Sequence, residues 1–228
     1  MNIALIPAAG SGSRIGSARA KQFLELSGIP ILIRTLKKFE DCEQIDQIVV
    51  ALPAAELSGF LELTGKYGLR KITRIIAGGN ERQESVAKGL QAINNPKAEI
   101  VVVHDAVRPF VTVQQITDVI DRARETGAAM LALPVTDTVK EVSDGIVTRT
   151  LDRKHIYLAQ TPQAFRIDLL REAHRKAASD GVLATDEAAL VERLGSSVAI
   201  VEGSPQNIKI TRKQDLALAE LILKETED

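Results

Sequence analysis

The sequence predicts an α/β fold in which one mostly parallel sheet carries helices on both faces. Short runs of β-branched residues recur along the chain, stretches with helical periodicity separate these runs, and a glycine-rich loop follows the first of them. This alternation is typical of parallel sheets, because a parallel pair of strands needs a crossover that usually contains a helix. The chain has 228 residues and 45% hydrophobic content, which is enough for a substantial core. We expect a single domain over residues 1–228.

Six runs are expected to form the strands of the sheet, and each of them is five to seven residues long. In chain order they are Asn2–Ile6, Gln47–Ala51, Lys71–Ala77, Glu99–His104, Ala129–Val135 and Val198–Glu202. Apolar runs of this length fit buried strands, whereas a membrane-spanning helix takes about 20 apolar residues. The sequence therefore predicts no membrane span.

Capping patterns mark where the helices between these strands begin and end. In three segments a residue that favours the N-cap stands three positions before a glutamine: Asn80, Thr112 and Thr211. Gly127 and Gly195 are expected to end helices, because glycine readily adopts the left-handed conformation that follows a last turn. The apolar residues of the last helix are expected in the core; they are Leu216, Leu218, Leu221 and Ile222.

Residues 136–160 break the alternation of strands and helices. Two β-rich stretches, Thr138–Val142 and Ile146–Leu151, flank the turn at residues 143–145. This pattern predicts a β-hairpin arm inserted into the α/β domain. An isolated two-stranded hairpin is only marginally stable in water, so the arm is expected to pack against a second subunit.

Composition limits the classes of partner. The formal net charge is −1 and only 3% of the residues are aromatic, which argues against a nucleic-acid-binding surface with a basic face and stacking rings. The single cysteine, Cys42, excludes an internal disulfide, and the chain begins with a strand rather than a signal-peptide pattern. We therefore expect a cytoplasmic protein that binds small molecules.

Three loops that follow predicted strands are rich in polar residues and glycine. They span residues 7–14, 78–85 and 104–109. In an open α/β sheet, ligands bind beyond the carboxyl ends of the strands. We expect these loops to converge on one crevice.

The first loop, Pro7-Ala8-Ala9-Gly10-Ser11-Gly12-Ser13-Arg14, predicts a site for a nucleoside triphosphate. Gly10 and Gly12 have no Cβ, so their backbone N–H groups can approach phosphate oxygens closely. Arg14 and the nearby Lys21 add positive charge, which would stabilise charge that develops on a phosphate during reaction. An exposed surface position is the alternative for each of these cations.

The glycine spacing of this loop also resembles a dinucleotide-binding fingerprint. That interpretation requires an acidic residue at the end of the second strand to bind a ribose. The strand ends Ile48-Val49-Val50-Ala51-Leu52-Pro53, which contains no carboxylate. The dinucleotide interpretation also gives no role to the two cations of the loop. A triphosphate explains both of them better.

The first loop together with Lys21-Gln22-Phe23 resembles the nucleotidyltransferases that join a sugar or alditol phosphate to a nucleotide. Three later segments narrow the resemblance to the 2-C-methyl-D-erythritol 4-phosphate cytidylyltransferases of the non-mevalonate isoprenoid pathway. These segments are His104–Pro109, Thr161–Gln163 and Asn207–Thr211. The resemblance runs from Ile3 to about Leu221 and implies a Rossmann-like nucleotidyltransferase domain.

A sister family, the ribitol 5-phosphate cytidylyltransferases, shares these motifs. Three further segments resemble the methylerythritol family: Pro134–Lys140, Leu151–Arg153 and Thr185–Ala188. The resemblance therefore favours the methylerythritol substrate over ribitol phosphate. A third reading is a regulatory nucleotide-binding homologue without turnover, since fold alone does not determine function.

The resemblance implies that an alditol phosphate oxygen attacks the α-phosphorus of CTP and that pyrophosphate leaves. No covalent protein nucleophile is needed, because positioning and charge stabilisation supply most of the catalysis. Catalytic roles are implied for Arg14, Lys21, Arg153 and Lys209. Nucleotide contacts are implied for Pro7, Ala8, Ala9, Gly10, Gly12, Gly79, Asn80, Ser85 and Asp105. Contacts to the alditol phosphate are implied for Asp105, Arg108, Thr138, Arg153, Thr161, Thr185 and Lys209.

Asp105 is expected at the end of a buried strand, where an unpaired carboxylate would be costly. A Mg²⁺ ion bound with the triphosphate would offset that cost, and one carboxylate suffices because Mg²⁺ keeps several waters. A salt bridge to Arg108 is the alternative. His104 is expected to be structural, because an ionised phosphate needs no general base.

Several implied contacts have structural alternatives. Asn80 stands where many relatives carry an aspartate; it still has an acceptor oxygen but gains a donor, which weakens the preference for cytosine over uracil. Thr138 and Thr161 also fit plain strand positions. Thr185 and Asp186 could instead begin a helix over residues 187–194.

The family resemblance also implies a homodimer with shared active sites. In that arrangement the arm crosses to the neighbouring subunit, so Thr138, Arg153 and Thr161 complete the partner's site. A monomer is then expected to be inactive.

Overall fold

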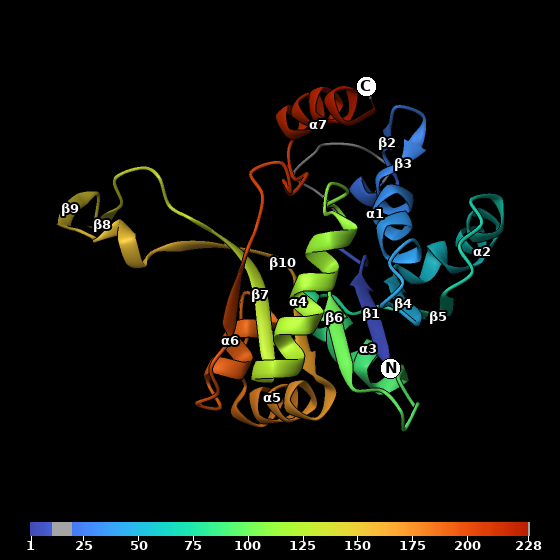
Figure 1. The fold of residues 1–228 in the computed structure, drawn as a ribbon, viewed down its shortest axis with the longest axis horizontal. Helices are drawn as coiled ribbons and strands as arrows, with labels where there is room; N and C mark the ends of the chain where they lie inside the picture. The colour runs from blue at the N-terminus through green and yellow to red at the C-terminus, as the bar shows by residue number, and fades with distance from the viewer. Residues whose placement is uncertain (11–19, 228) are drawn as a thin grey trace.

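The computed structural model describes residues 1–10 and 20–227 (Figure 1). Its centre is a seven-stranded sheet in the order β11-β7-β10-β6-β1-β4-β5. The strands are β1 (Asn2–Pro7), β4 (Gln47–Leu52), β5 (Ile72–Ala77), β6 (Ile100–Val103), β7 (Ala128–Pro134), β10 (Tyr157–Arg166) and β11 (Ala199–Glu202). The predicted α/β fold with a mostly parallel sheet is confirmed, and each of the six predicted strands is present with bounds close to the prediction.

One strand of the main sheet, β10, was not predicted. It lies between β6 and β7 and runs antiparallel to both. Its pairing with β7 shifts register between Ala159 and Gln163, where the segment contains polar residues and a proline. This irregularity hides the strand from a search for alternating or continuous apolar residues.

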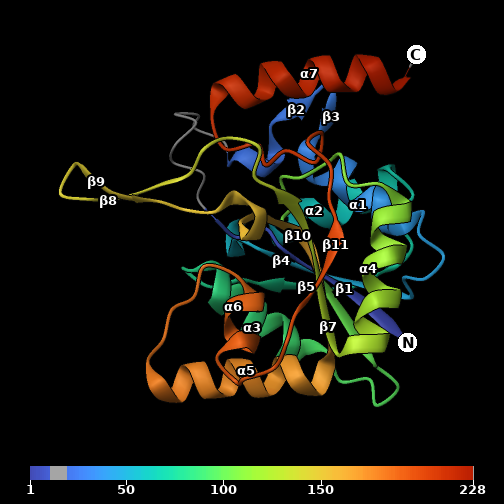
Figure 2. The same ribbon diagram turned by 60° about the vertical axis from the view of Figure 1, so that its left-hand side comes forward.

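Helices cover both faces of the sheet because successive side chains of a strand point to opposite sides. Ala4 and Ile6 of β1 pack in one cluster with α1 (Ile31–Glu40), α2 (Leu57–Lys66) and α4 (Val113–Thr126). Ile3 and Leu5 pack in another cluster with α3 (Arg82–Ala92), α5 (Ile167–Asp180) and α6 (Glu187–Glu192). Figure 2 shows α3, α5 and α6 gathered on one side of the sheet and α1 and α4 on the other.

The last helix, α7 (Lys213–Glu227), lies across a two-stranded ribbon made of β2 (Glu25–Leu26) and β3 (Ile29–Pro30) (Figure 2). Its buried residues include Ala219, Ile222 and Leu223. The expectation that all four apolar positions lie in the core is wrong for Leu218 and Leu221, which are 47% and 58% exposed. This helix packs on a two-stranded ribbon rather than on the main sheet, so it buries a narrower face.

The predicted helix signals hold in part. Thr112 forms the expected capping box with Gln115, and Gly127 ends α4 with φ = 88°. Asn80 is not an N-cap, because α3 begins at Arg82, one residue later than expected. The N-cap position is Glu81, whose side chain makes no capping hydrogen bond. Thr211 is not one either: α7 begins at Lys213, and the Asp215 carboxylate accepts both the backbone N–H and the hydroxyl of Thr211. The helix α6 ends at Glu192, before the predicted stop, but Gly195 has the expected left-handed conformation with φ = 78°.

The predicted hairpin arm is present. Its strands are β8 (Lys140–Ser143) and β9 (Ile146–Thr150), joined by Asp144 and Gly145 at positive φ. Figure 1 shows the hairpin far from the body of the domain, at the end of two extended connections. Its upper bound differs from the prediction, because residues 157–160 already belong to β10.

No helix in the described part of the chain is both long enough and apolar enough to cross a membrane.

Candidate functional site

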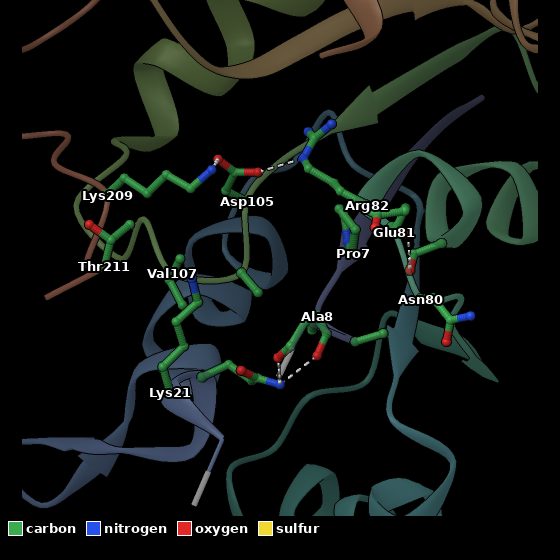
Figure 3. Close-up of a pocket in the computed structure, with 15 residues that line it drawn as sticks. Pro7, Ala8, Lys21, Asn80, Glu81, Arg82, Asp105, Val107, Lys209 and Thr211 are labelled. Carbon is green, nitrogen blue, oxygen red and sulfur yellow. Dashed lines mark hydrogen bonds and ion pairs between the residues drawn. The ribbon is translucent and has the colours of Figure 1, made fainter. Parts of the chain in front are cut away.

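A pocket of about 470 Å³ opens at the carboxyl ends of β1, β5 and β6 (Figure 3). The three polar loops noted in the sequence all contribute to its lining. The lining residues are Pro7, Ala8, Ala9, Gly10, Lys21, Gln22, Asn80, Glu81, Arg82, Ser85, Asp105, Ala106, Val107, Lys209 and Thr211. In Figure 3, Lys21 and Lys209 lie on one side of the pocket, and Arg82 and Asn80 lie on the other.

A buried glutamine holds the first loop. The Gln22 side-chain amide donates hydrogen bonds to the carbonyl oxygens of Ala8, at 2.6 Å, and Gly10, at 3.4 Å. Sequence reasoning gave Gln22 no role, although it stands beside Lys21 in the quoted motif. Two predicted site residues of this loop, Gly12 and Arg14, lie outside the described residues.

The second loop packs closely against the first. A Cβ on Gly78 would collide with the Ala9 side chain and lie 2.8 Å from Ser85 Oγ, so this position requires glycine. The Ser85 hydroxyl accepts a hydrogen bond from the Gly79 N–H at 3.0 Å and donates one to the Glu81 carbonyl at 3.1 Å. Ser85 therefore shapes the loop, and its predicted contact to the nucleotide stays a prediction.

Asn80 is exposed at the rim of the pocket. Its backbone N–H donates to the Glu84 carboxylate at 2.9 Å. With the capping role excluded, its side chain is left for the ligand or for solvent.

Asp105 follows β6 and is surrounded by cations. Its Oδ1 accepts from Arg82 Nε at 2.9 Å, and its Oδ2 lies 2.8 Å from Lys209 Nζ and 3.5 Å from Arg108 Nε. Burial alone would raise the pKa of this carboxyl, but Arg82, Lys209 and Arg108 outweigh burial and hold the pKa far below its usual range. The carboxylate is therefore ionised at neutral pH.

The ion pair with Arg108, weighed in the sequence as the alternative to metal binding, is present. Among the described residues, no group of three or more histidine, cysteine or acidic side chains could hold a metal ion. Both oxygens of Asp105 already face cations, so this carboxylate does not fit a direct metal site in the present arrangement. A metal bound directly to Asp105 would have to share the carboxylate oxygens with Arg82 and Lys209, and the metal contact of Asp105 stays a prediction.

His104 closes a chain of hydrogen bonds behind Asp105. His104 Nε2 donates to the Arg108 carbonyl at 3.0 Å, because a carbonyl oxygen can only accept. Nδ1 of the neutral ring therefore accepts from the Thr161 hydroxyl at 3.1 Å, and Thr161 Oγ1 accepts from the Asp105 N–H at 3.0 Å. Burial lowers the pKa of His104 to about 4, which is consistent with this neutral tautomer. The prediction that His104 is structural agrees with this geometry. Thr161 orients the Asp105 loop of its own chain, so the expectation that it completes a partner's site is wrong.

A second pocket of about 200 Å³ adjoins the first and shares Arg82, Asp105 and Lys209 with it. Arg108, Thr161 and Thr185 also line this second pocket. Four of the residues predicted to contact the alditol phosphate therefore lie here together with Asp105. Asp186, considered in the sequence as a helix start, is the N-cap of α6 and accepts from the Ala189 N–H.

Two predicted residues lie elsewhere. Thr138 and Arg153 are exposed at the base of the arm and line neither pocket of their own chain. The Arg153 guanidinium bonds to the Thr136 carbonyl.

Sequence reasoning missed Arg82 and Glu187. Arg82 bridges Asp105 and the buried carboxylate of Glu187, which accepts from Arg82 Nη1 at 2.8 and 2.6 Å. Arg82 lies in the polar loop 78–85 and Glu187 in the segment Thr185–Ala188, but a separation of 105 positions concealed their contact.

Comparison with known proteins decides the family. The family model described as 2-C-methyl-D-erythritol 4-phosphate cytidylyltransferase matches residues 2–225. The chain belongs to this family. A cytidylyltransferase of that name from Syntrophus aciditrophicus is 49% identical over 227 residues, which cover 99% of this chain and 97% of the relative.

Solved structures of the 2-C-methyl-D-erythritol 4-phosphate cytidylyltransferase family share the fold. The Thermus thermophilus enzyme of that name has a TM-score of 0.78 and 38% identity, with 97% of this chain and 98% of that chain covered. The 4-diphosphocytidyl-2C-methyl-D-erythritol synthase from Anaerococcus prevotii has a TM-score of 0.87 and 31% identity, with 98% of each chain covered. The nucleotidyltransferase fold implied by the sequence is thus confirmed.

Proposed function

We propose that the chain transfers the cytidylyl group of CTP to 2-C-methyl-D-erythritol 4-phosphate. The products are 4-diphosphocytidyl-2-C-methyl-D-erythritol and pyrophosphate, in isoprenoid precursor biosynthesis. The observation that carries the proposal is the pair of adjoining pockets with a shared wall of Arg82, Asp105 and Lys209. The family match supplies the identity of the substrates.

The geometry suggests how the chain would catalyse this transfer. CTP would occupy the larger pocket, with its phosphates near the glycine-rich loop and Lys21. The alditol phosphate would occupy the smaller pocket, where Lys209 and Arg108 can bind its phosphate. An oxygen of that phosphate would attack the α-phosphorus in line, and the cations would stabilise the charge of the transition state and of the departing pyrophosphate.

We propose that the reaction uses Mg²⁺ and that CTP brings the ion on its triphosphate. Mg²⁺ usually takes one or two carboxylates together with substrate phosphates and keeps several waters. When bound, the ion would neutralise phosphate charge. Asp105, through its ion pairs, holds Lys209 and Arg108 at the edge of the two pockets.

A homodimer with shared active sites is part of the same proposal. Apolar side chains of the arm are exposed, with Ile146 at 71% and Val142 and Val147 at 55%. Thr138 and Arg153 at its base line neither of the two pockets described above. A second copy would cover the apolar side chains and receive Arg153. A cytoplasmic location is proposed because the one cysteine, Cys42, is buried and unpaired, as suits a reducing compartment.

The test is pyrophosphate release from CTP and Mg²⁺, with methylerythritol phosphate and D-ribitol 5-phosphate supplied separately. We expect release that depends on methylerythritol phosphate and falls roughly 100-fold or more in Lys21→Ala, because a charge-stabilising group is lost. Lys97→Ala, an exposed lysine outside both pockets, is the matched control and should keep full activity. Equal or faster release with ribitol phosphate would contradict the substrate assignment. CTP binding without release under either condition would favour a non-catalytic homologue.

A further inference from the structure

Glu187 is a buried carboxylate to which the proposed reaction assigns no step. It is the first residue of α6, and its side chain is 1% exposed. Both of its oxygens accept from Arg82 Nη1, and within the described part of the chain no other group bonds to this carboxylate. A buried charge is retained only with a close partner, so Glu187 and Arg82 form one unit.

Arg82 connects this unit to the two pockets. Its Nε donates to Asp105 Oδ1 at 2.9 Å while its Nη1 is occupied by Glu187. The planar guanidinium holds both carboxylates at fixed relative positions, which a flexible ammonium group could not do. Arg82, the first residue of α3, thereby fixes one oxygen of a residue that lines both pockets.

The support behind Glu187 is rigid. The neighbouring Asp186 caps α6 and accepts a hydrogen bond from the Gln163 side-chain amide at 2.8 Å. The oxygen of the same amide accepts from the Ala188 N–H at 3.1 Å. Because Gln163 belongs to β10 of the central sheet, the start of α6 is anchored to the sheet on both sides of Glu187.

The charges of the cluster also require Glu187. Three cations, Arg82, Arg108 and Lys209, face the single carboxylate of Asp105. Glu187 gives Arg82 a second carboxylate partner, at 2.6 Å from Nη1, whereas Arg108 and Lys209 have an ion pair only with Asp105. Without Glu187, Arg82 would compete with Arg108 and Lys209 for the oxygens of Asp105 and for the phosphate of the substrate.

We propose that Arg82 and Glu187 are positioning residues that hold the Asp105 carboxylate in the orientation that cytidylyl transfer needs. The inference rests on the proposed function and adds to it a pair that acts through Asp105. Its signature is a loss of turnover with little change in nucleotide binding.

The test is Glu187→Gln, which keeps the size of the side chain and removes its charge. We expect kcat to fall about 10- to 100-fold, as is common when a group that orients an active-site ligand is removed. The KM for CTP should stay within about threefold, because the glycine-rich loop is untouched. Glu192→Gln, an exposed carboxylate at the end of the same helix, is the matched control and should leave kcat unchanged.

Arg82→Lys provides a second, independent variant. It keeps the positive charge but cannot bridge two carboxylates, so it should lower kcat to a similar extent. A variant that combines Glu187→Gln with Arg82→Lys should be no slower than Arg82→Lys alone, because both substitutions break the same link from Glu187 through Arg82 to Asp105. If Glu187→Gln fails to fold, Arg82→Lys carries the test by itself.

Wild-type kcat in folded Glu187→Gln or in Arg82→Lys would overturn the inference. So would losses that multiply in the double variant, or a rise in the KM for CTP with kcat unchanged. A wild-type chain that does not turn over methylerythritol phosphate would instead contradict the proposed function, so the two failures are distinguishable.

Discussion

Two buried histidines make the free energy of unfolding of the protein depend on pH. His104 has hydrogen-bond partners on both ring nitrogens, whereas His174 Nε2 is buried without one among the described residues. Burial lowers the pKa of both imidazoles from 6.5 to about 4. The folded chain therefore holds both rings neutral at a pH where the unfolded chain protonates them.

We predict that His174→Leu makes the protein less sensitive to acid. The unfolded chain binds a proton at this residue near pH 6.5 and the folded chain only near pH 4. The free energy of unfolding therefore falls as the pH drops from 6.5 to 4, by on the order of 3 kcal/mol for this residue. Denaturant titrations at several pH values would measure it. An unchanged slope in His174→Leu would refute the prediction.

Residue types that bind phosphate were recognisable from the sequence, but their partners were not. Lys21, Asp105 and Lys209 lie in short sequence motifs, so a role in phosphate binding could be inferred from their neighbours in the chain. The link from Arg82 to Glu187 depends on how the start of α6 packs beside α3, which local patterns do not encode. The expected capping role of Asn80 failed because the helix begins one residue later than the pattern suggested.

The β8–β9 hairpin is the element whose position most needs a partner. It forms its own two-stranded sheet, separate from the main sheet, and its apolar side chains are exposed. Such a hairpin gains little stability alone, so contact with a second copy would supply the missing burial.

We predict that two inactive variants complement each other across the dimer. Arg153→Ala and Lys209→Ala should each abolish most activity, because each removes a cation for the alditol phosphate. Co-expressed, they should recover about a quarter of wild-type activity, since half of the dimers are mixed and each has one intact site. Turnover and mass of the co-purified dimers measure this. No recovery in confirmed mixed dimers would place Arg153 in the site of its own chain.

Elements with a simple apolar pattern were predictable, and β10 was not. The central parallel strands β4 and β6 are nearly continuous apolar runs, such as residues 100–103, as is typical of strands buried on both faces. In β10 the register shift and the polar residues at its centre break that pattern. Its polar residues are the ones that reach the site, since Thr161 and Gln163 bind the Asp105 loop and the start of α6.

The whole molecule places two small-molecule pockets at one edge of a sheet. The carboxyl ends of β1, β5 and β6 supply the larger pocket, and β10 with the start of α6 completes the smaller one. In the proposed reaction, the shared wall would bring the α-phosphate of CTP and the phosphate of the alditol close to the same cations. This arrangement suits the joining of two substrates better than the binding of one.

The most direct measurement is a competition between the two alditol phosphates in one reaction. Wild-type protein, CTP and Mg²⁺ would be incubated with equal amounts of 2-C-methyl-D-erythritol 4-phosphate and D-ribitol 5-phosphate, and the cytidylyl products would be identified by mass. We predict that 4-diphosphocytidyl-2-C-methyl-D-erythritol dominates and forms in equal amount with pyrophosphate. Dominance of the ribitol product, or unchanged CTP in a sample that still binds it, would contradict the account.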